Sequence, residues 1–426
     1  MKAVLIDKLQ RTEREALLGE LAAQYEQYKQ AGLKLDMSRG KPCKQQLALS
    51  NGLLTALQEE DFALEGGMDA RNYGLLSGTA EMKAIFSELL DVAPQSLLIG
   101  DGSSLNLMYD FISRAYTHGV RAGAAPWKDK KVKWLCPAPG YDRHFAVTEH
   151  FGFELILVPM LDDGPDMDMV ERLAANDASV KGIWCVPVYS NPTGTVYSER
   201  TVRRLAGMRC AADDFTILWD NAYALHSLNG EFVNLPEIMG LCAEAGNPER
   251  AVLFASTSKI TFAGGGVSCM ACGPQTMQAA LAALGVQTIG HNKINQLLHA
   301  RFLKNKETIM RHMDKQAQII RPKFEKVLDI LAGELDGWNL AGWTKPLGGY
   351  FINFVAPKNT AKRIVELCGK AGVKLTPAGA AFPYGIDPDD SNIRIAPTYP
   401  SIDELETATR LLALSTKIAA LERTLS

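Results

Sequence analysis

The stretch Val252-Leu253-Phe254-Ala255-Ser256-Thr257-Ser258-Lys259-Ile260-Thr261-Phe262-Ala263-Gly264 joins a short apolar run to hydroxyl side chains, one lysine and a glycine run. The apolar half predicts a buried strand, and the glycines that follow predict a loop. Most lysines are solvated surface residues, but burial at the end of a strand lowers the pKa of an amine and makes it nucleophilic. We therefore expect Lys259 to be chemically active.

The same pattern, an apolar run followed by polar residues, recurs along much of the chain. Between about residues 80 and 275, apolar runs alternate with amphipathic segments, which is typical of an α/β fold with a mostly parallel sheet covered on both faces. The predicted strands cover residues 96–99, 133–136, 155–159, 182–187, 216–219 and 252–255. Ligands bind at the carboxyl ends of such strands, so the polar clusters that follow them are expected to form one site.

Three regions of the chain differ in character. Residues 1–45 predict an amphipathic helix, over about 5–30, and an arm that packs with the small domain. Residues 46–300 predict the large domain, and residues 301–426 predict a smaller α+β domain. A single helix over about 291–333, with Pro322 as a candidate kink, is expected to connect the two domains.

Composition argues against several classes of function. The 426 residues carry a formal net charge of −3 and no basic run, which argues against nucleic-acid binding. No stretch reaches the ~18 apolar residues of a membrane span, and the N-terminus lacks the apolar run of a signal peptide, so we expect a cytoplasmic protein. The lone pair Cys269 and Cys272 offers too few ligands for zinc, and we expect core thiols and no metal.

Three polar motifs follow predicted strands, and each also has a plain structural explanation. Asp220-Asn221-Ala222-Tyr223 is compatible with a helix cap, and Asn191-Pro192-Thr193-Gly194 with a turn. Gly102-Ser103-Ser104 is compatible with an ordinary helix start, although amides and hydroxyls at a helix start also suit a phosphate. Their shared position after strands favours a binding site.

Taken in chain order, these motifs resemble those of fold-type I aminotransferases, which use pyridoxal phosphate (PLP), over essentially the whole chain. Ser38-Arg39-Gly40-Lys41-Pro42, Asn72-Tyr73-Gly74 and Lys259–Gly264 are most similar to the aspartate aminotransferase group allied to the PLP domains of MocR-type regulators. The resemblance implies a large, mostly parallel, seven-stranded sheet domain covered by helices, a smaller α+β domain, and PLP as cofactor.

The resemblance also implies the chemical roles of residues at the strand ends. Lys259 forms the Schiff base with PLP and transfers the substrate proton, and Asp220 pairs with the pyridine nitrogen. Tyr223 and Asn191 donate to the ring oxygen, and Tyr141 stacks on the ring. We count Lys259, Asp220 and Tyr223 as catalytic.

Further positions are implied to bind phosphate and substrate. The phosphate residues are Gly102, Ser103, Ser104, Ser256 and Ser258, joined by Tyr73 from the neighbouring subunit of a homodimer. Arg394 in Asn-Ile-Arg-Ile-Ala is implied to grip the substrate α-carboxylate, because its planar fork suits a carboxylate, and Asn191 lies beside the substrate.

The chain departs from the family pattern at two places. Typical members carry a phosphate-binding arginine where this chain has Val267. The cation for a distal substrate carboxylate is also unassigned. By spacing Lys293 is the nearest candidate, and Arg39, Lys41 and Arg143 are the other candidate cations. Gly40, next to Arg39, is a further position implied to bind the substrate.

The resemblance to this group implies aspartate:2-oxoglutarate transamination, with amino acids and 2-oxo acids as substrates and ping-pong kinetics. The alternatives are an aminotransferase specific for alanine or aromatic amino acids, or a C–S β-lyase. A non-enzymatic PLP sensor domain, as in MocR-type regulators, is a further alternative. The segment before Arg39 is too short for the DNA-binding module that such regulators require.

Overall fold

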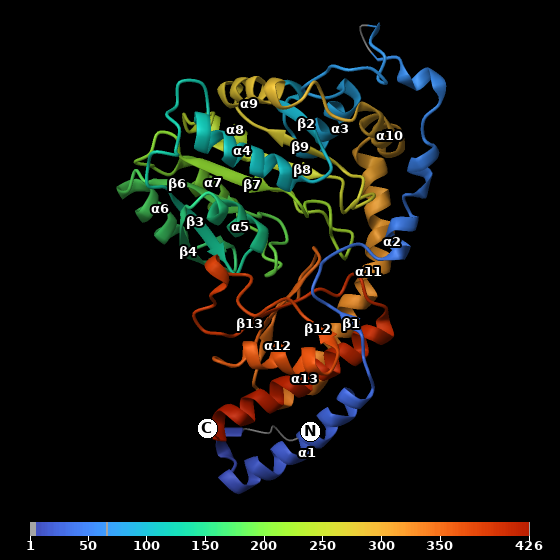
Figure 1. The fold of residues 1–426 in the computed structure, drawn as a ribbon, viewed down its shortest axis with the longest axis vertical. Coiled ribbons are helices and arrows are strands. Elements are labelled where there is room, and N and C mark those ends of the chain that lie inside the picture. Colours follow the sequence, from blue (N-terminus) through green and yellow to red (C-terminus); the bar gives the residue numbers. More distant parts are fainter. Residues whose placement is uncertain (1–5, 65–66, 426) are drawn as a thin grey trace.

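The computed structural model describes residues 6–64 and 67–425 of the 426-residue chain. Figure 1 shows two bodies, a large one built around a twisted sheet and a smaller one that contains the C-terminal helix. The helix α11 (Lys306–Leu335) packs with the core of the large body at its start and with the core of the small body further along. We keep the predicted domain boundaries near residues 45 and 300 as a proposal.

The large body is organised by an eight-stranded sheet, in which the two-residue β5 (Gly164–Pro165) adds an edge strand to the seven expected. Across the sheet, the other strands are β2 (Leu97–Asp101), β9 (Val267–Ala271), β8 (Ala251–Ser256), β7 (Thr216–Asp220), β6 (Val180–Cys185), β3 (Lys133–Ala138) and β4 (Glu154–Leu161). The strands from β8 to β4 pair in parallel, and β9 is antiparallel to both neighbours. The predicted mostly parallel α/β sheet is confirmed.

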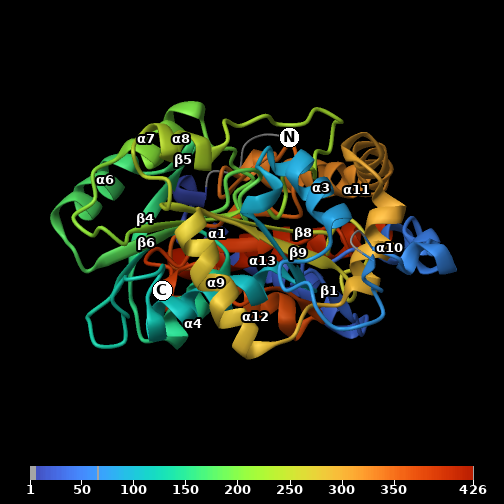
Figure 2. The same cartoon turned by 90° about the horizontal axis from the view of Figure 1, so that it is seen from above.

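Helices cover both faces of this sheet, as Figure 2 shows from above. One face carries α4 (Ser104–His118), α5 (Asp142–His150) and α9 (Pro274–Gln287). The other carries α3 (Ala80–Leu90), α6 (Met167–Asn176), α7 (Glu199–Gly207), α8 (Ile238–Glu244) and α10 (Lys293–Leu303). Because both faces are covered, β6 and β7 are buried at every residue. No helix in the described ranges is long and apolar enough to cross a membrane.

The small body is built on a three-stranded antiparallel sheet of β10 (Gly342–Trp343), β11 (Ile352–Val355) and β13 (Asn392–Ile395). Its core also receives apolar residues from α1 (Arg11–Gln30), α12 (Ala361–Lys370) and α13 (Ile402–Leu425). The arm strand β1 (Leu35–Asp36) pairs in parallel with β12 (Val373–Lys374), and α2 (Lys44–Ala48) follows it.

Two helix predictions need correction. The N-terminal helix begins at Arg11, after a short 3-10 turn at Ile6–Lys8, and the predicted start at Leu5 lies outside the described residues. The single helix predicted over 291–333 is wrong, because α10 and α11 are separate helices. Lys304 ends α10 with a φ of +61°, and the side chain of Asn305 caps α11 by accepting from the Thr308 amide at 2.9 Å. Apolar periodicity continues across this two-residue break and so concealed it.

Pro322 lies inside α11 without ending the helix. The thiols of Cys269 and Cys272 are both buried, but they pack in the cores on opposite faces of the sheet. Strand residues alternate between faces, so residues three apart point in opposite directions. This pair therefore cannot bind one metal ion together.

Candidate active site

The predicted site residues meet at one edge of the large sheet because they end or follow neighbouring strands. Lys259 follows β8, Asp220 is the last residue of β7, and Asn191 follows β6. Tyr141 follows β3, the next strand across the sheet. Parallel strands deliver these side chains to the same edge. Arg394, from β13 of the small body, reaches the same place, with its Nη1 3.3 Å from Asn191 Oδ1.

Two side chains hold the backbone at Lys259 in place. The backbone carbonyl of Lys259 accepts from His226 Nε2 at 3.3 Å and from the Tyr350 hydroxyl at 3.4 Å. Donation to a carbonyl requires the imidazole proton on Nε2. Burial, with a smaller effect from the Lys259 charge, lowers the pKa of His226 to about 3, so its ring is neutral. On the other side, Lys259 Nζ lies 4.3 Å from the centroid of the Tyr223 ring.

Asp220 is a buried carboxylate with one oxygen bound and one free. Its Oδ2 lies 3.0 Å from His144 Nε2, and its buried Oδ1 has no hydrogen-bond partner within residues 6–64 and 67–425. His144, on α5, is stacked on Trp184 with ring centroids 4.4 Å apart, which fixes its orientation. A buried acceptor without a donor is costly, so Oδ1 is suited to a ligand N–H.

His144 is absent from the sequence-based predictions. Its only sequence signal is its spacing of three residues from Tyr141, which places both side chains on one side of the first turn of α5. The two rings lie edge to face, with centroids 4.8 Å apart. Burial raises the pKa of Tyr141 to about 12, against a smaller opposing effect of Lys259, and burial raises the pKa of Tyr223 as well. Both phenols are therefore hydrogen-bond donors at neutral pH.

The five residues predicted to bind phosphate lie on two chain segments and form a cradle, which we call the phosphate cradle: Gly102, Ser103, Ser104, Ser256 and Ser258. Ser103 caps α4, and the Ser258 hydroxyl donates to the Gly102 carbonyl at 3.1 Å. The Ser256 and Ser258 hydroxyls lie 3.0 Å apart. Gly266 closes the cradle, because a Cβ built on it would lie 2.6 Å from Ser258 Oγ. Amides at the start of a 15-residue helix, together with these hydroxyls, suit a phosphate.

Val267 contributes no charge to this cradle. It is a buried residue of β9, and its amide donates to the Thr257 hydroxyl at 2.9 Å. The phosphate-binding arginine that typical family members carry at this position is therefore replaced in the three-dimensional site by an uncharged side chain.

Arg394 is buried and already has an acidic partner. Its Nη1 lies 2.7 Å from Oδ1 of Asp142, the first residue of α5, and its guanidinium lies 5.0 Å from the Phe351 ring centroid. Its buried Nε has no partner in the described part of the chain. Asp142 is absent from the sequence-based predictions, since nothing in the sequence indicates a contact with a residue 252 positions away.

The other predicted substrate residues lie in different surroundings. Arg39 is exposed, and Gly40 touches Phe351 so closely that a Cβ would lie 2.4 Å from the ring. Lys293 is buried, and its ammonium donates to the carbonyl of Gly74 at 3.0 Å. Tyr73, which precedes Gly74 in the chain, is 77% exposed. The remaining candidates, Lys41 and Arg143, are exposed as well.

Comparison with solved structures identifies the class of fold to which this chain belongs. The chain has a TM-score of 0.73 to the Thermus thermophilus α-aminoadipate aminotransferase LysN, solved in complex with N-(5'-phosphopyridoxyl)-L-leucine. The identity is 22%, with 92% of this chain and 93% of that chain covered, a likeness that shows the fold. The molecule therefore has the fold of the fold-type I aminotransferases.

More similar proteins define the family. The sequence model described as aspartate amino-transferase matches residues 9–426. An aspartate aminotransferase of Corynebacterium glutamicum is 46% identical over 404 residues, which are 95% of this chain and 93% of that protein. The crystal structure of an aspartate transaminase from the same organism has a TM-score of 0.96 at 43% identity, with 99% and 100% of the two chains covered. The chain belongs to the aspartate aminotransferase family.

Proposed function

We propose that this protein transfers the amino group of aspartate to 2-oxoglutarate, with PLP as cofactor and ping-pong kinetics. The observation that carries the proposal is Asp220, whose Oδ2 is held by His144 while its buried Oδ1 has no partner among the residues described. A protonated pyridine nitrogen suits such an oxygen. The name of the 46% identical Corynebacterium glutamicum relative supports aspartate as the substrate.

The side chains around Asp220 fit the rest of the cofactor. Tyr141 would stack on the ring, and Asn191 and Tyr223 would donate to the ring oxygen. Lys259 would bind the aldehyde carbon covalently, and the phosphate would lie in the phosphate cradle. When bound, PLP supplies an electron sink for the bond that breaks at the substrate Cα.

The protein's own side chains would position the substrate and move its proton. Arg394 would bind the α-carboxylate, and Asn191, 3.3 Å from Nη1, would help to orient the fork. The Lys259 amine would then take the proton from Cα as a general base. Lys293, the buried cation beside Gly74, remains our candidate for the distal carboxylate, in a site shared with a second subunit.

We also propose a homodimer with shared active sites. Tyr73 is 77% exposed, and near it the chain segment after α9 presents Ile289 at 62% exposure. The two segments touch, because a Cβ on Gly290 would lie 2.4 Å from the Gly74 carbonyl oxygen. Val286, at the end of α9, is 91% exposed. Exposed apolar side chains grouped in this way mark an interaction surface.

A reducing compartment, such as the cytoplasm, is the setting that we propose. All eight cysteines are free thiols, and all but Cys210 are buried. Persistent disulfides are characteristic of oxidising compartments. Fractionation of the native cells, with the protein followed by antibody, would check this assignment.

An assay of the PLP-loaded protein with a panel of amino donors and 2-oxo acid acceptors tests the function. Fastest turnover with aspartate and 2-oxoglutarate would support the proposal. A preference for alanine or an aromatic amino acid, or elimination from a cysteine conjugate, would favour one of the alternative activities. PLP binding without turnover, combined with a gel shift on DNA, would instead indicate a sensor domain.

A further inference from the structure

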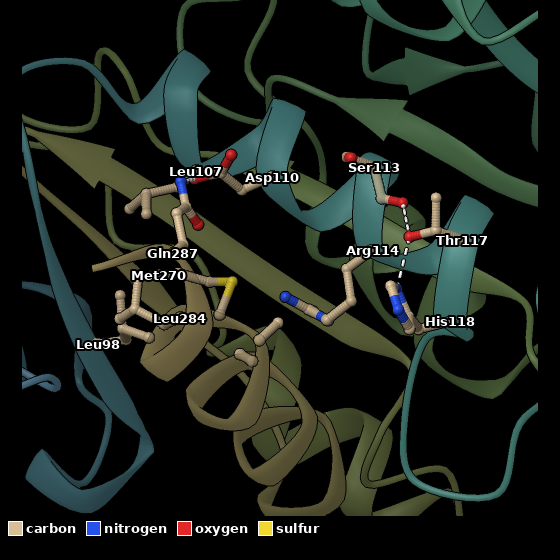
Figure 3. A pocket seen from close by; sticks show the side chains of 12 residues that line it. Leu98, Leu107, Asp110, Ser113, Arg114, Thr117, His118, Met270, Leu284 and Gln287 are labelled. Atoms are coloured by element: carbon tan, nitrogen blue, oxygen red, sulfur yellow. Dashed lines mark hydrogen bonds between the residues drawn. The ribbon is translucent and has the colours of Figure 1, made fainter. Parts of the chain in front are cut away.

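A cavity outside the proposed active site lies between α4 and α9. Its volume is about 270 Å³, and it has a polar wall and an apolar floor (Figure 3). The wall comes from α4 and includes Asp110 and Arg114, and the floor includes Leu98, Met270 and Leu284. Arg114 lies ten positions after Ser104 of the phosphate cradle, which corresponds to about 15 Å along α4.

Arg114 is a largely buried cation with no hydrogen-bonded anion among the described residues. The residue is 8% exposed, and its Nε and Nη2 atoms have no hydrogen-bond partner within the described ranges. In Figure 3 its side chain extends from α4 between the other residues that line the cavity. The guanidinium also lies 5.1 Å from the Phe111 ring centroid, and burial lowers its pKa. A buried charge without a hydrogen-bonded counter-ion is unfavourable, so an anion bound at this place would stabilise the guanidinium.

Asp110 attracts the Arg114 guanidinium by charge but is not hydrogen-bonded to it. It lies one turn before Arg114 on α4, and the two form no ion pair within 4.0 Å among the described residues. Its Oδ2 accepts from Gln287 Nε2 at 3.5 Å instead, and burial raises its pKa. The cavity therefore holds an unused guanidinium fork next to an apolar floor.

We propose that this cavity binds a small organic carboxylate with an apolar body. The carboxylate would accept from the Arg114 guanidinium, and the body would cover Leu98, Met270 and Leu284. The fork geometry suits a bidentate carboxylate, and the floor excludes a bare inorganic anion as the best ligand. The site takes no part in the proposed transamination and does not depend on it.

Isovalerate, which has neither an amino nor an oxo group to transfer, is the probe for this site. Calorimetric titration of the PLP-loaded protein should detect its binding, and Arg114→Met should weaken that binding roughly tenfold or more. Arg209→Met, which removes an exposed arginine, is the matched control and should bind normally. Arg394→Met should retain this binding, which separates the cavity from the proposed substrate site. Isoamylamine, with the same body and a cationic head, should not bind.

Two outcomes would overturn the proposal. The first is isovalerate binding that is unchanged in Arg114→Met. The second is that the wild-type protein does not bind isovalerate. Sedimentation of Arg114→Met would then show whether the substitution also weakens the dimer, and a weakened dimer would assign the carboxylate to a partner subunit. If Arg114→Met does not fold, Arg114→Lys keeps the charge but loses the fork, and it should bind isovalerate more weakly than the wild-type protein.

Discussion

Arg394 Nη1 and Asp142 Oδ1 lie 2.7 Å apart and join the small body to the first turn of α5. Asp142 thereby occupies part of the fork that we assign to the substrate carboxylate. Asp142→Asn should lower KM for aspartate roughly three- to tenfold, with little change in kcat, because the substrate no longer competes with a charged neighbour. Steady-state kinetics at fixed 2-oxoglutarate measures this. A higher KM would show that Asp142 orients Arg394 instead.

Asp220→Asn should reduce kcat roughly 10²–10³-fold, because a neutral amide cannot stabilise a protonated ring nitrogen. An amide has nearly the same size and shape as the carboxylate that lies 3.0 Å from His144, so we expect little loss of thermal stability. Asp213→Asn, on an exposed carboxylate, is the control. Wild-type turnover in Asp220→Asn would remove the main support for the proposed cofactor position.

Lys259→Ala should abolish turnover and the visible absorbance of the protein-bound cofactor, because the nucleophilic amine is lost. The absorbance spectrum of the purified protein after incubation with PLP measures this directly. Lys130→Ala, at an exposed lysine, should leave the spectrum unchanged. Retained activity in Lys259→Ala would refute our assignment of the catalytic amine.

Gly266→Ala should weaken PLP binding roughly tenfold, because the added methyl group would lie 2.6 Å from Ser258 Oγ and displace it from the phosphate cradle. Gly265→Ala is a close control, since the nearest atom to its Cβ would be Phe262 Cβ at 3.9 Å. Fluorescence titration of the apoprotein with PLP gives both dissociation constants. Equal effects of the two substitutions would argue that Gly266 does not shape the cradle.

His226 should make the protein sensitive to acid. Its pKa is about 3 in the folded state, and an unfolded histidine titrates near 6.5. Between these two pKa values the unfolded state binds more protons than the folded state. The free energy of unfolding is therefore not reduced by His226 above about pH 6.5, and it decreases as the pH falls below that value. From pH 7 to pH 5, the wild-type protein should lose about 2 kcal/mol more stability than His226→Gln. Urea unfolding at both pH values measures this, and equal losses would contradict it.

Much of this architecture could be predicted from the sequence because it depends on neighbours in the chain. Apolar runs with polar ends identified the central strands, and residues such as Asp220 and Lys259 stand at or just after strand ends in the structure, as expected. The break between α10 and α11 was not predictable in the same way. It depends on the left-handed backbone of one lysine, Lys304, which carries no strong local signal.

The sequence by itself determined the class of fold and the positions of the reactive side chains along the chain. This was possible because buried strands and their ends depend on patterns of apolar and polar residues only a few positions long. Only the tertiary structure decided the partners of those side chains. His144 meets Asp220, and Asp142 meets Arg394, across 76 and 252 residues respectively. Arg114 lines a cavity between α4 and α9, with its Nε and Nη2 without a hydrogen-bond partner among the described residues. Such contacts arise from packing between distant segments, which local sequence patterns do not encode.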